Sequence, residues 1–574
     1  MTLRILVAAV LALMVSACAG ADRAERAGPV TLSIAGTNDF HGAVLPANGR
    51  GGLALFSGYL KNLRSAREAD GAVLVIDAGD MWQGTMESNL GEGAIVVEAY
   101  NYLQYTATTI GNHEFDFGPV GQAATPQAPG DDPRGNLKAR LAEARFPVVT
   151  ANILDRSTGQ PVNLPNVSAS TTVEAAGVRV GIVGVLTRTG FEETIRANLV
   201  GLELAPVTEA IRTEAGRLRA SGAEVVIVAA HAGGSCREFG EPRNLESCNE
   251  RAEIVEVARA LEPGLVDVIV AGHTHGAMAH EVNGIAIIES FSNGRAFGRV
   301  DLVVDTSGAV ETKTIHRPQD ICEYAEPGAV RCAEPGAGPM PPRAVYEGAP
   351  VEADPAIDAI LAPAVERVAA IKAEPLGVTA ATPLPIRGEV ESPLGNLFAD
   401  AMLDASGGAD LVINNTDGGL RADLPAGPLT YGRLFEVFPF DNQLVTLAMT
   451  GSDLERILAE HLGRSRSLLG LAGGRVLARC ANGRLDVRVV RVDGREIADD
   501  EEILVATTDY LATTDMFASV RRPDGDIGTG PIVRDVVAER LRRRGGTVEA
   551  ATLVNPEQPR FPPRSVLPMT CKVP

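Results

Sequence analysis

Five apolar segments in the first half of the chain each end in residues that commonly bind metal ions. The residues are Asp39, His41, Asp80, Asn112, His113, His231, His273 and His275, which include five of the eight histidines in the chain. Imidazole nitrogens, carboxylates and amide oxygens are ligands for zinc, manganese, iron and similar divalent ions. Because α/β folds bind ligands beyond the carboxyl ends of their strands, we expect these side chains to converge on one site.

The segment GNHEFDFG begins at Gly111 and concentrates an amide, an imidazole and two carboxylates. It follows the apolar run AYNYLQYTATTI, which predicts a strand. Taken singly, each of these residues has an ordinary alternative, since Asp and Asn often cap turns and His113 with Asp116 could form a buried structural pair. Their joint occurrence at five strand ends favours a catalytic metal centre.

The overall composition limits the classes of protein that need to be considered. The chain has 574 residues, is 45% hydrophobic and carries a net charge of −21. Such a chain is globular and long enough for two or more domains, which excludes a disordered protein. The acidic balance disfavours binding of a nucleic acid polymer. An anionic substrate therefore needs local cations, from metals or a few arginines.

The elements that position these residues follow an α/β rhythm. From Val30 to about Asp305, short apolar runs alternate with helical stretches, which predicts buried strands. Residues 318–355 are rich in Pro and Gly and predict a linker. The next segment predicts a helix, in which Pro363 implies a kink or a late start. A second α/β region follows from Leu376 to Leu567, without an internal repeat or a further membrane segment.

The N-terminus indicates export. Residues 1–18 contain a basic start, an apolar run and the sequence VSAC, which predict a signal peptide. VSAC resembles a bacterial lipobox, in which Cys18 would be lipidated and become the first mature residue. Ala19 would then direct the lipoprotein to the outer membrane of a Gram-negative cell, facing the periplasm or the surface. The alternative is an ordinary cleaved signal with a chance cysteine.

The remaining six cysteines suggest disulfides, although they allow 15 pairings. Local spacing favours Cys236 with Cys248 and Cys322 with Cys332, which leaves Cys480 with Cys571. None of these cysteines has the tight spacing of a zinc knot.

The ordered motifs D-x-H, G-D, G-N-H-E, A-H and G-H-T-H resemble those of the calcineurin-like metallophosphoesterases. Together with the second α/β region, the chain is similar to the bacterial 5'-nucleotidase and UDP-sugar hydrolase family. The resemblance implies a four-layer α/β/β/α sandwich over residues 30–317. It also implies a linker and interdomain helix over residues 318–375, and a C-terminal α/β substrate-binding domain over residues 376–567.

The resemblance implies two divalent metal ions, such as Zn, Mn or Co. One site would use Asp39, His41, Asp80 and His275, and the other would use Asp80 as a bridge with Asn112, His231 and His273. Some relatives carry Gln at the position of His275. His113 would be the catalytic imidazole, oriented by Asp116, while Glu114 would hold local structure.

The second region carries weaker motifs that imply a nucleotide site. In DGGLR, Arg421 would clamp a phosphate or carboxylate, because its planar fork matches such groups. In FPFDNQ, Phe440 would stack on a base and Asn442 would hydrogen-bond to it. Tyr510 would be the second aromatic, followed by Asp515. Taken singly, such aromatic residues are more often part of a core.

This substrate site departs from the family pattern. Val390 and Gly388 stand where relatives often have arginines, with Arg387 displaced by one residue. Thr416 replaces an expected Asn, although Asn415 is adjacent, and the G-G-D turn has become Thr513, Thr514 and Asp515.

The sequence thus predicts an exported metal-dependent phosphohydrolase of the 5'-nucleotidase type that strips phosphate from nucleotides for salvage. UDP-sugars and 2',3'-cyclic nucleotides are further candidate substrates. The alternatives are a non-catalytic nucleotide-binding or adhesion lipoprotein and a hydrolase of a non-phosphate ester. We expect a small-molecule substrate and no nucleic acid polymer. His280, His316 and His461 are expected to serve packing, as is Trp82 beside the site.

Overall fold

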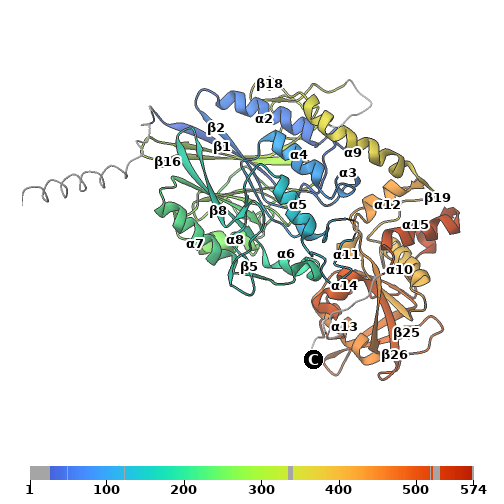
Figure 1. Ribbon diagram of the computed structural model, residues 1–574. Coiled ribbons are helices and arrows are strands. Elements are labelled where there is room, and N and C mark those ends of the chain that lie inside the picture. Colours follow the sequence, from blue (N-terminus) through green and yellow to red (C-terminus); the bar gives the residue numbers. More distant parts are fainter. Residues whose placement is uncertain are drawn as a thin grey trace, which may run out of the picture.

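The computed structural model describes residues 26, 28–47, 49–121, 123–333, 340–517, 519–520 and 530–571. The chain forms two α/β bodies that lie against each other, joined by one long helix (Figure 1). Among these residues no helix is long and apolar enough to cross a bilayer. The predicted signal peptide and Cys18 lie outside the described residues.

The first body contains a seven-stranded sheet in the order β16-β15-β1-β2-β3-β4-β7. Strands β1 to β4 run parallel, and β15 and β16 add antiparallel strands at one side. In that order the strands span Val310–Asp320, Ala296–Val304, Val30–Thr37, Gly71–Asp77, Ala107–Thr109, Val148–Val149 and Val167–Ser168.

A second sheet of six strands has the order β13-β14-β12-β11-β9-β8. Its central strands β14, β12, β11 and β9 are parallel. In sheet order the strands span Ala277–Val282, Ile285–Ser290, Val268–Ala271, Val225–His231, Val178–Leu186 and Ser170–Ala175.

The two sheets pack face to face and are covered by helices on their outer faces. Fully buried residues such as Ile34, Ile76, Ile182 and Ile227 form the layer between the sheets. On the outer faces, α2 (Leu53–Arg67), α4 (Ala94–Leu103) and α5 (Gly135–Glu143) cover the first sheet, and α7 (Val207–Ala220) and α8 (Glu253–Ala260) cover the second. Because both faces of each sheet are buried, its strands are apolar runs rather than alternating ones. The predicted four-layer sandwich is confirmed.

The prediction of a single strand before Gly111 is wrong in part. The helix α4 continues to Leu103 and ends at Gln104, whose φ of 58° is left-handed. Only Ala107–Thr109 forms a strand. The apolar run is shared by a buried helix face and a short buried strand, two patterns that hydrophobicity alone does not separate.

The connecting helix α9 spans Pro355–Ala373 and contacts elements of both bodies. Its N-terminus is capped by Asp354, whose carboxylate accepts a hydrogen bond from the Ala356 amide. The helix continues through Pro363, so the alternative of a late start is wrong. In Figure 1 this yellow helix runs from the blue helices of the first body toward the second.

The C-terminal body is built on a four-stranded sheet, β22-β26-β20-β23, with α10 and α13 packed against its strands. Its strands span Leu444–Thr450, Glu502–Thr508, Leu411–Asn415 and Leu469–Ala472. A three-stranded sheet, β21-β19-β27, spans Gly427–Thr430, Pro375–Ala380 and Gly546–Val548, and a hairpin joins β24 (Gly474–Ala481) to β25 (Arg484–Arg491). The main helices are α10 (Pro393–Ala405), α12 (Tyr431–Val437), α13 (Gly451–Arg464) and α15 (Val533–Arg544).

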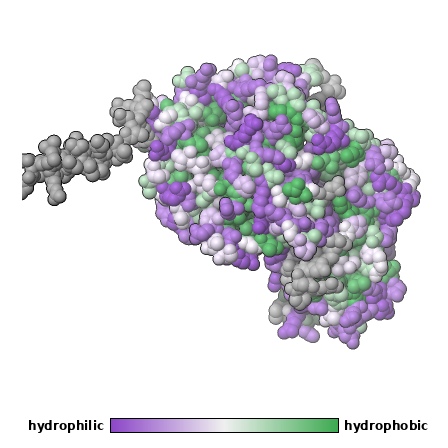
Figure 2. Space-filling view, viewed as in Figure 1, coloured by the Kyte–Doolittle hydropathy of each residue, from purple (hydrophilic) through white to green (hydrophobic). Residues whose placement is uncertain are grey.

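The remaining elements are short. They are α3 (Met86–Asn89), α6 (Arg188–Glu193), α11 (Thr416–Gly419), α14 (Asp509–Thr513), β5 (Ile153–Asp155), β6 (Gln160–Pro161), β10 (Leu202–Leu204), β17 (Val345–Tyr346), β18 (Ala349–Pro350), η1 (His113–Phe115), η2 (Arg196–Leu199), η3 (Asp515–Phe517), η4 (Ala550–Thr552) and η5 (Arg564–Val566). Figure 2 shows hydrophilic residues over much of the visible surface, with apolar residues in small groups between them.

All three predicted disulfides are present: Cys236–Cys248, Cys322–Cys332 and Cys480–Cys571. The third ties the C-terminal tail to β24 of the hairpin. Three disulfides are typical of proteins in oxidising, extracytoplasmic compartments.

A buried carboxylate lies in the core of the first body at the end of β2. Asp77 accepts hydrogen bonds from the Gly79 amide at 2.8 Å, the Thr37 hydroxyl at 2.6 Å and the Tyr100 hydroxyl at 3.2 Å. Burial raises the pKa of Asp77 to about 7, against the lowering effect of these donors. The carboxyl group therefore holds a proton in the folded protein at mildly acidic pH.

We expect Asp77→Asn to change how stability depends on pH. The pKa of Asp77 is higher in the folded state than the ordinary 3.8, so the stabilisation from protonation is complete below pH 3.8 and is lost as the pH rises through about 7. Between about pH 4.5 and about pH 7.5 the free energy of unfolding of the unmodified protein should fall by about 3 kcal/mol relative to the variant. Denaturant titrations with a chelator present measure this difference; parallel pH profiles would contradict it.

Candidate active site

The seven predicted metal ligands lie together at one edge of the two sheets. Asp39 and His41 follow β1, Asp80 follows β2, Asn112 follows β3, His231 ends β11, and His273 and His275 follow β12. All these strands are parallel within their sheets, so their carboxyl ends meet at the same edge.

The backbone at this edge is strained. Five of these seven residues have left-handed φ angles: 48° at Asp39, 50° at His41, 58° at Asp80, 78° at His273 and 55° at His275. Residues other than glycine rarely adopt such angles, and they concentrate at functional sites where the surrounding structure imposes them. The strained turns aim the side chains inward from strands that have ended.

The first group of ligand atoms comes from Asp39, His41 and His275, whose ligand atoms lie within 4.8 Å of one another. The Nε2 atoms of His41 and His275 are 3.0 Å apart, and His275 Nε2 is 3.5 Å from Asp39 Oδ1. His41 Nε2 lies 3.9 Å from Asp80 Oδ2. The structure thus brings together all four residues predicted for the first metal site.

The second group centres on His231, whose Nε2 lies 3.2 Å from Asp80 Oδ2 and 3.0 Å from Asn112 Oδ1. The ring of His273 is 5.1 Å from the ring of His231. His273 Nε2 also lies 3.8 Å from Glu193 Oε2, a carboxylate that sequence reasoning missed. Asp80 touches members of both groups, as a bridging ligand must.

The chemistry of this donor set fits two divalent cations. His41 Nδ1 lies 2.9 Å from the Gln83 carbonyl and His231 Nδ1 lies 2.8 Å from the Ala78 carbonyl. If each Nδ1 donates its proton there, both Nε2 lone pairs face the cluster, as metal-binding histidines require. Two buried carboxylates and several imidazoles with inward lone pairs are stabilised by bound cations.

The metal-free charges of the two groups differ. Burial lowers the pKa of His41 to about 3, so this ring is neutral. Burial also disfavours the charged form of His231, but Asp80 outweighs it and raises the pKa of that ring to about 10. Without metal, a proton on His231 compensates the Asp80 carboxylate; a divalent ion would replace that proton.

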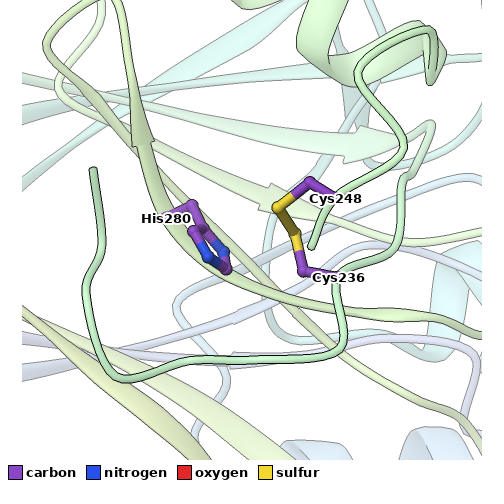
Figure 3. Close-up of side chains that lie close together, drawn as sticks. All are labelled: Cys236, Cys248 and His280. Atoms are coloured by element: carbon purple, nitrogen blue, oxygen red, sulfur yellow. A yellow bond between two sulfur atoms is a disulfide. The ribbon is translucent and has the colours of Figure 1, made fainter. Parts of the chain in front are cut away.

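Two other groups of residues have suitable spacing but are not metal sites. Cys236, Cys248 and His280 lie close together, as do Asp320, Cys322 and Cys332. Figure 3 shows that the sulfur atoms of Cys236 and Cys248 are bonded to each other beside the His280 ring. Disulfide sulfurs are not thiolates, so each group keeps only one possible ligand: His280 in the first, and Asp320, which pairs with Arg50 at 2.6 Å, in the second. His280 is buried, in line with the packing role predicted for it.

His113 and Asp116 form a close pair beside the predicted metal ligands. The His113 Nδ1 atom lies 2.5 Å from Asp116 Oδ2, and the His113 amide donates to Asp80 Oδ1 at 2.9 Å. Burial lowers the pKa of His113, but the Asp116 and Asp80 carboxylates outweigh it and raise the pKa above its ordinary value. These two carboxylates thus favour the charged form of His113, in which Nε2 is a hydrogen-bond donor.

Glu114 holds the loops that carry the ligands. Its carboxylate accepts hydrogen bonds from the backbone amides of Asp80 at 2.8 Å, Met81 at 2.7 Å and Gly111 at 2.6 Å. These contacts join the turn after β2 to the turn after β3, which supports the structural role expected for Glu114. Burial is the main cause that raises the pKa of Glu114 to about 8, followed by the nearby Asp80.

Two further positioning contacts were not anticipated. Asn38 donates to Asp39 Oδ2 at 2.7 Å and accepts from the Ser290 amide at 2.9 Å. The buried carboxylate of Glu289 accepts from the Thr274 hydroxyl at 2.6 Å, which fixes the turn between the last two histidines. The sequence offered a hint of the first contact, because Asn38 directly precedes Asp39. It offered none for Glu289, which lies near the end of an apolar strand.

A cavity of about 440 Å³ opens between this cluster and the C-terminal body. Arg421, Phe440, Asn442 and Tyr510 line it opposite His113 and Asp116. Arg421 Nη2 lies 3.2 Å from His113 Nε2, and the Arg421 guanidinium lies 5.1 Å from the centre of the Phe440 ring. The Phe440 ring is stacked 5.9 Å from the His113 ring. The two bodies thus share one site.

Two of the residues predicted to bind substrate have other partners. The Asn442 amide donates to Asp509 Oδ1 at 3.2 Å, although the residue still borders the cavity. Asp515 lies outside the cavity lining, and its carboxylate pairs with Arg196 of the first body at 2.6 Å. In this arrangement the largely exposed Asp515 side chain points toward the domain boundary, and its role in substrate binding stays a prediction. Cavity-lining Asn414 and Arg564 were missed, since neither belongs to a motif.

We expect Glu114→Ala to weaken metal binding by about 10- to 100-fold, because it leaves three buried backbone amides without an acceptor and loosens the Asp80 turn. Glu114→Gln, which keeps one acceptor oxygen, should show a smaller loss. Calorimetric titration with Mn²⁺ or Zn²⁺ measures the affinities. Glu366→Ala on the exposed face of α9 is the control, and equal affinity in Glu114→Ala and the control would show that Glu114 does not position the ligands.

Comparisons with known proteins agree with this geometry. Residues 32–277 match the family described as calcineurin-like phosphoesterase, and residues 372–519 match the 5'-nucleotidase C-terminal domain. Endonuclease YhcR of Bacillus subtilis is 28% identical over 88% of this chain, and the match spans 38% of that relative. A 5'-nucleotidase of Vibrio vulnificus is 25% identical, with 93% of this chain and 95% of the relative covered.

The structure is similar to that of a 5'-nucleotidase precursor from Thermus thermophilus, with a TM-score of 0.70 and 25% identity, covering 93% of this chain and 99% of the other. The two family matches coincide with the two bodies that enclose the cavity. The chain therefore belongs to the 5'-nucleotidase family and is a metal-dependent phosphoesterase with a calcineurin-like N-terminal domain and a 5'-nucleotidase C-terminal domain.

Proposed function

We propose that this protein is an exported 5'-nucleotidase that hydrolyses the phosphate ester of small nucleotides. The observation that carries the proposal is the contact across the cavity, where Arg421 and Phe440 of the C-terminal domain face His113 beside the metal ligands. A phosphate held by Arg421 lies next to both the imidazole and the dinuclear centre, while Phe440 offers an aromatic face for a base. UDP-sugars and 2',3'-cyclic nucleotides are further candidates.

Asp39, His41, Asp80 and His275 would hold one metal ion, and Asp80, Asn112, His231 and His273 the other. Two divalent ions at this centre would supply an oxygen nucleophile at neutral pH and neutralise the phosphoryl oxygens. The side chain of His113, protonated and oriented by Asp116, donates a hydrogen bond from Nε2 to the phosphoryl group or to the leaving oxygen. Arg421 neutralises the remaining negative charge and orients the phosphate.

The base would lie between the rings of Phe440 and Tyr510, both of which border the cavity. Such stacking tolerates every base, because each has a flat aromatic face. The Asn442 side chain adds a hydrogen bond at the edge of the base through its amide oxygen, whereas its amide nitrogen is held by Asp509. This arrangement supports a preference for nucleotides over simple phosphate esters.

Three alternatives remain to be tested against this proposal. A binding or adhesion lipoprotein has no need of the His113–Asp116 pair. An uncharged ester would make the cationic Arg421 redundant. One relative is named an endonuclease, but the net charge of −21 disfavours a nucleic acid polymer as substrate.

Export is supported by the three disulfides. We further propose that Cys18 carries a lipid that anchors the protein to the outer membrane of a Gram-negative envelope. Metabolic labelling with a fatty acid, compared between the unmodified chain and Cys18→Ala, tests the anchor, and equal labelling would contradict it.

We expect the metal-loaded protein to release phosphate from AMP or UMP, and His113→Ala to lower kcat by about 10²- to 10⁴-fold with unchanged metal content. The panel also contains ADP, UDP-glucose, 2',3'-cyclic AMP, bis(p-nitrophenyl) phosphate and single-stranded DNA. Wells in which diester cleavage alone occurs receive a coupled phosphomonoesterase.

Glu366→Ala, on the exposed face of α9, controls for nonspecific effects. Activity on the generic diester alone would reject the nucleotidase assignment. Cleavage of DNA alone would favour a nuclease. The absence of activity on every substrate would favour the binding or adhesion lipoprotein.

We also propose that the domains rotate about α9 to carry substrate toward the metals. Arg196 and Asp515 form an ion pair between the domains at 2.6 Å, so cysteines at these positions joined by a cleavable bis-maleimide linker should trap this arrangement. Cross-linking of Arg196→Cys/Asp515→Cys should lower turnover by at least tenfold, with metal content unchanged, and reductive cleavage of the linker should restore it. The unmodified protein under the same treatment is the control, and undiminished turnover of the cross-linked protein would argue against rotation.

A further inference from the structure

One buried arginine of the C-terminal domain contacts the loop of residues 438–441, which carries Phe440. Arg534 lies in the first turn of α15 and is 5% exposed. It does not line the cavity. A cation at this depth is strongly unfavourable unless its donors are paired. The groups that accept hydrogen bonds from Arg534 therefore identify the part of the chain that it stabilises.

Three of these acceptors belong to the loop. Arg534 Nη1 donates to the Phe438 carbonyl at 3.2 Å and to the Phe440 carbonyl at 2.9 Å. Arg534 Nη2 donates to Asp441 Oδ1 at 2.5 Å. The guanidinium thus binds the main chain on both sides of Pro439, and its planar fork imposes one geometry on all three bonds. The main chain of Phe440 is thereby fixed relative to α15.

The guanidinium is in turn fixed by two aromatic residues of α12. Its Nε donates to the Tyr431 hydroxyl at 3.0 Å, and this hydroxyl donates to Asp535 Oδ1 at 2.6 Å. The guanidinium carbon lies 4.4 Å from the centre of the Phe435 ring, within range of a cation–π interaction. Arg534 therefore makes four hydrogen bonds and one ring contact, which leave its side chain a single position.

The contacts of Arg534 differ from those that reach the same loop from the first domain. The Pro439 carbonyl accepts from the side chains of Gln83 and Asn89 across the domain boundary, so these bonds depend on how the domains are placed. The four acceptors of Arg534 all lie in the C-terminal domain. The proposed rotation about α9 would leave them intact, and the loop would keep its shape.

The shape of this loop decides where the Phe440 ring lies. The ring borders the cavity and packs edge-on against the buried Phe438 ring, with the ring centres 5.6 Å apart. Aromatic rings attract one another only over a narrow range of separations and angles. A change in the main chain at Phe440 would therefore weaken the stacking of a base on its ring.

We infer that Arg534 is a positioning residue that holds Phe440 in the orientation in which its ring stacks on the base of the substrate. This inference rests on the proposed nucleotidase function and deepens it. Arg534 touches no substrate, yet it sets the preference for phosphate esters that carry a base over those that do not. Lysine is a poor replacement, because a single ammonium lacks the planar fork that reaches acceptors on both sides of Pro439.

Kinetics of the metal-loaded protein on AMP and on ribose 5-phosphate, a phosphate ester without a base, test the inference. Arg534→Met keeps the packing against Phe435 but removes the donors. It should raise KM for AMP about tenfold and change KM for ribose 5-phosphate and both kcat values less than about twofold. Arg534→Lys should give a smaller change in the same direction. Arg543→Gln, an exposed arginine at the end of the same helix, is the matched control and should change none of these constants.

Amide hydrogen exchange gives a readout that needs no turnover. In Arg534→Met the amides of residues 438–442 should exchange about tenfold faster than in the unmodified protein, because the loop loses the donors that hold it. The amides of β26 should exchange at the same rate in both proteins. Arg543→Gln should leave the loop unchanged.

The inference is overturned if Arg534→Met raises KM equally for both esters, if it leaves KM for AMP unchanged, or if the loop exchanges at the same rate in the variant. A thermal unfolding scan identifies loss of fold, and in that case the same measurements on Arg534→Lys decide the outcome. Failure of the proposed function is a different result: the unmodified protein would release no phosphate from AMP or UMP, while hydrogen exchange would still decide whether Arg534 holds the loop.

Discussion

The burial of two carboxylates, Asp39 and Asp80, is the constraint on which the active-site edge depends. Both are almost fully buried among histidine rings, where an uncompensated negative charge is strongly unfavourable. The fold meets this constraint with imidazoles on neighbouring strand ends and with space for divalent ions. The left-handed backbone at five of the predicted ligands belongs to the same solution, because the chain must turn within a few residues of each strand end to aim every side chain at a common point.

Hydrogen bonds to two further carboxyl groups hold the turns on which the predicted metal ligands lie. Glu114 binds three backbone amides from two turns, and Glu289 fixes the turn that carries His273 and His275. Neither carboxylate is a predicted metal ligand. Each converts a flexible strand-end turn into a fixed one, and a dinuclear centre in which Asp80 would be shared by two ions needs such rigidity.

The C-terminal domain brings aromatic and cationic side chains to the cavity that it shares with the metal edge. Contacts of α9, contacts around Pro439 and the Arg196–Asp515 ion pair hold the two domains together at this cavity. The side chains of Gln83 and Asn89 donate to the Pro439 carbonyl at 3.0 and 2.9 Å. The acidic chain places three arginines at this cavity, where they attract anions that its overall charge would repel.

The sequence by itself determined the chemistry of the metal edge. Local motifs at the ends of apolar runs named the side chains that converge there and the His113–Asp116 pair, because strand direction in an α/β fold places such ends together. It also predicted the four-layer sandwich and the disulfide pairs. It misjudged the run before Gly111, where a buried helix and a buried strand share one apolar pattern.

Which side chains of the C-terminal domain reach the cavity was decided only by the tertiary structure. Whether Asp515 enters the cavity or pairs with Arg196 depends on how two domains pack, which no local pattern encodes. The arrival of Arg564 beside Asp417 depends on a tail anchored by Phe561 and by the disulfide to Cys480. Such contacts join residues more than a hundred positions apart, and their geometry is set by packing of the whole core rather than by the neighbouring sequence.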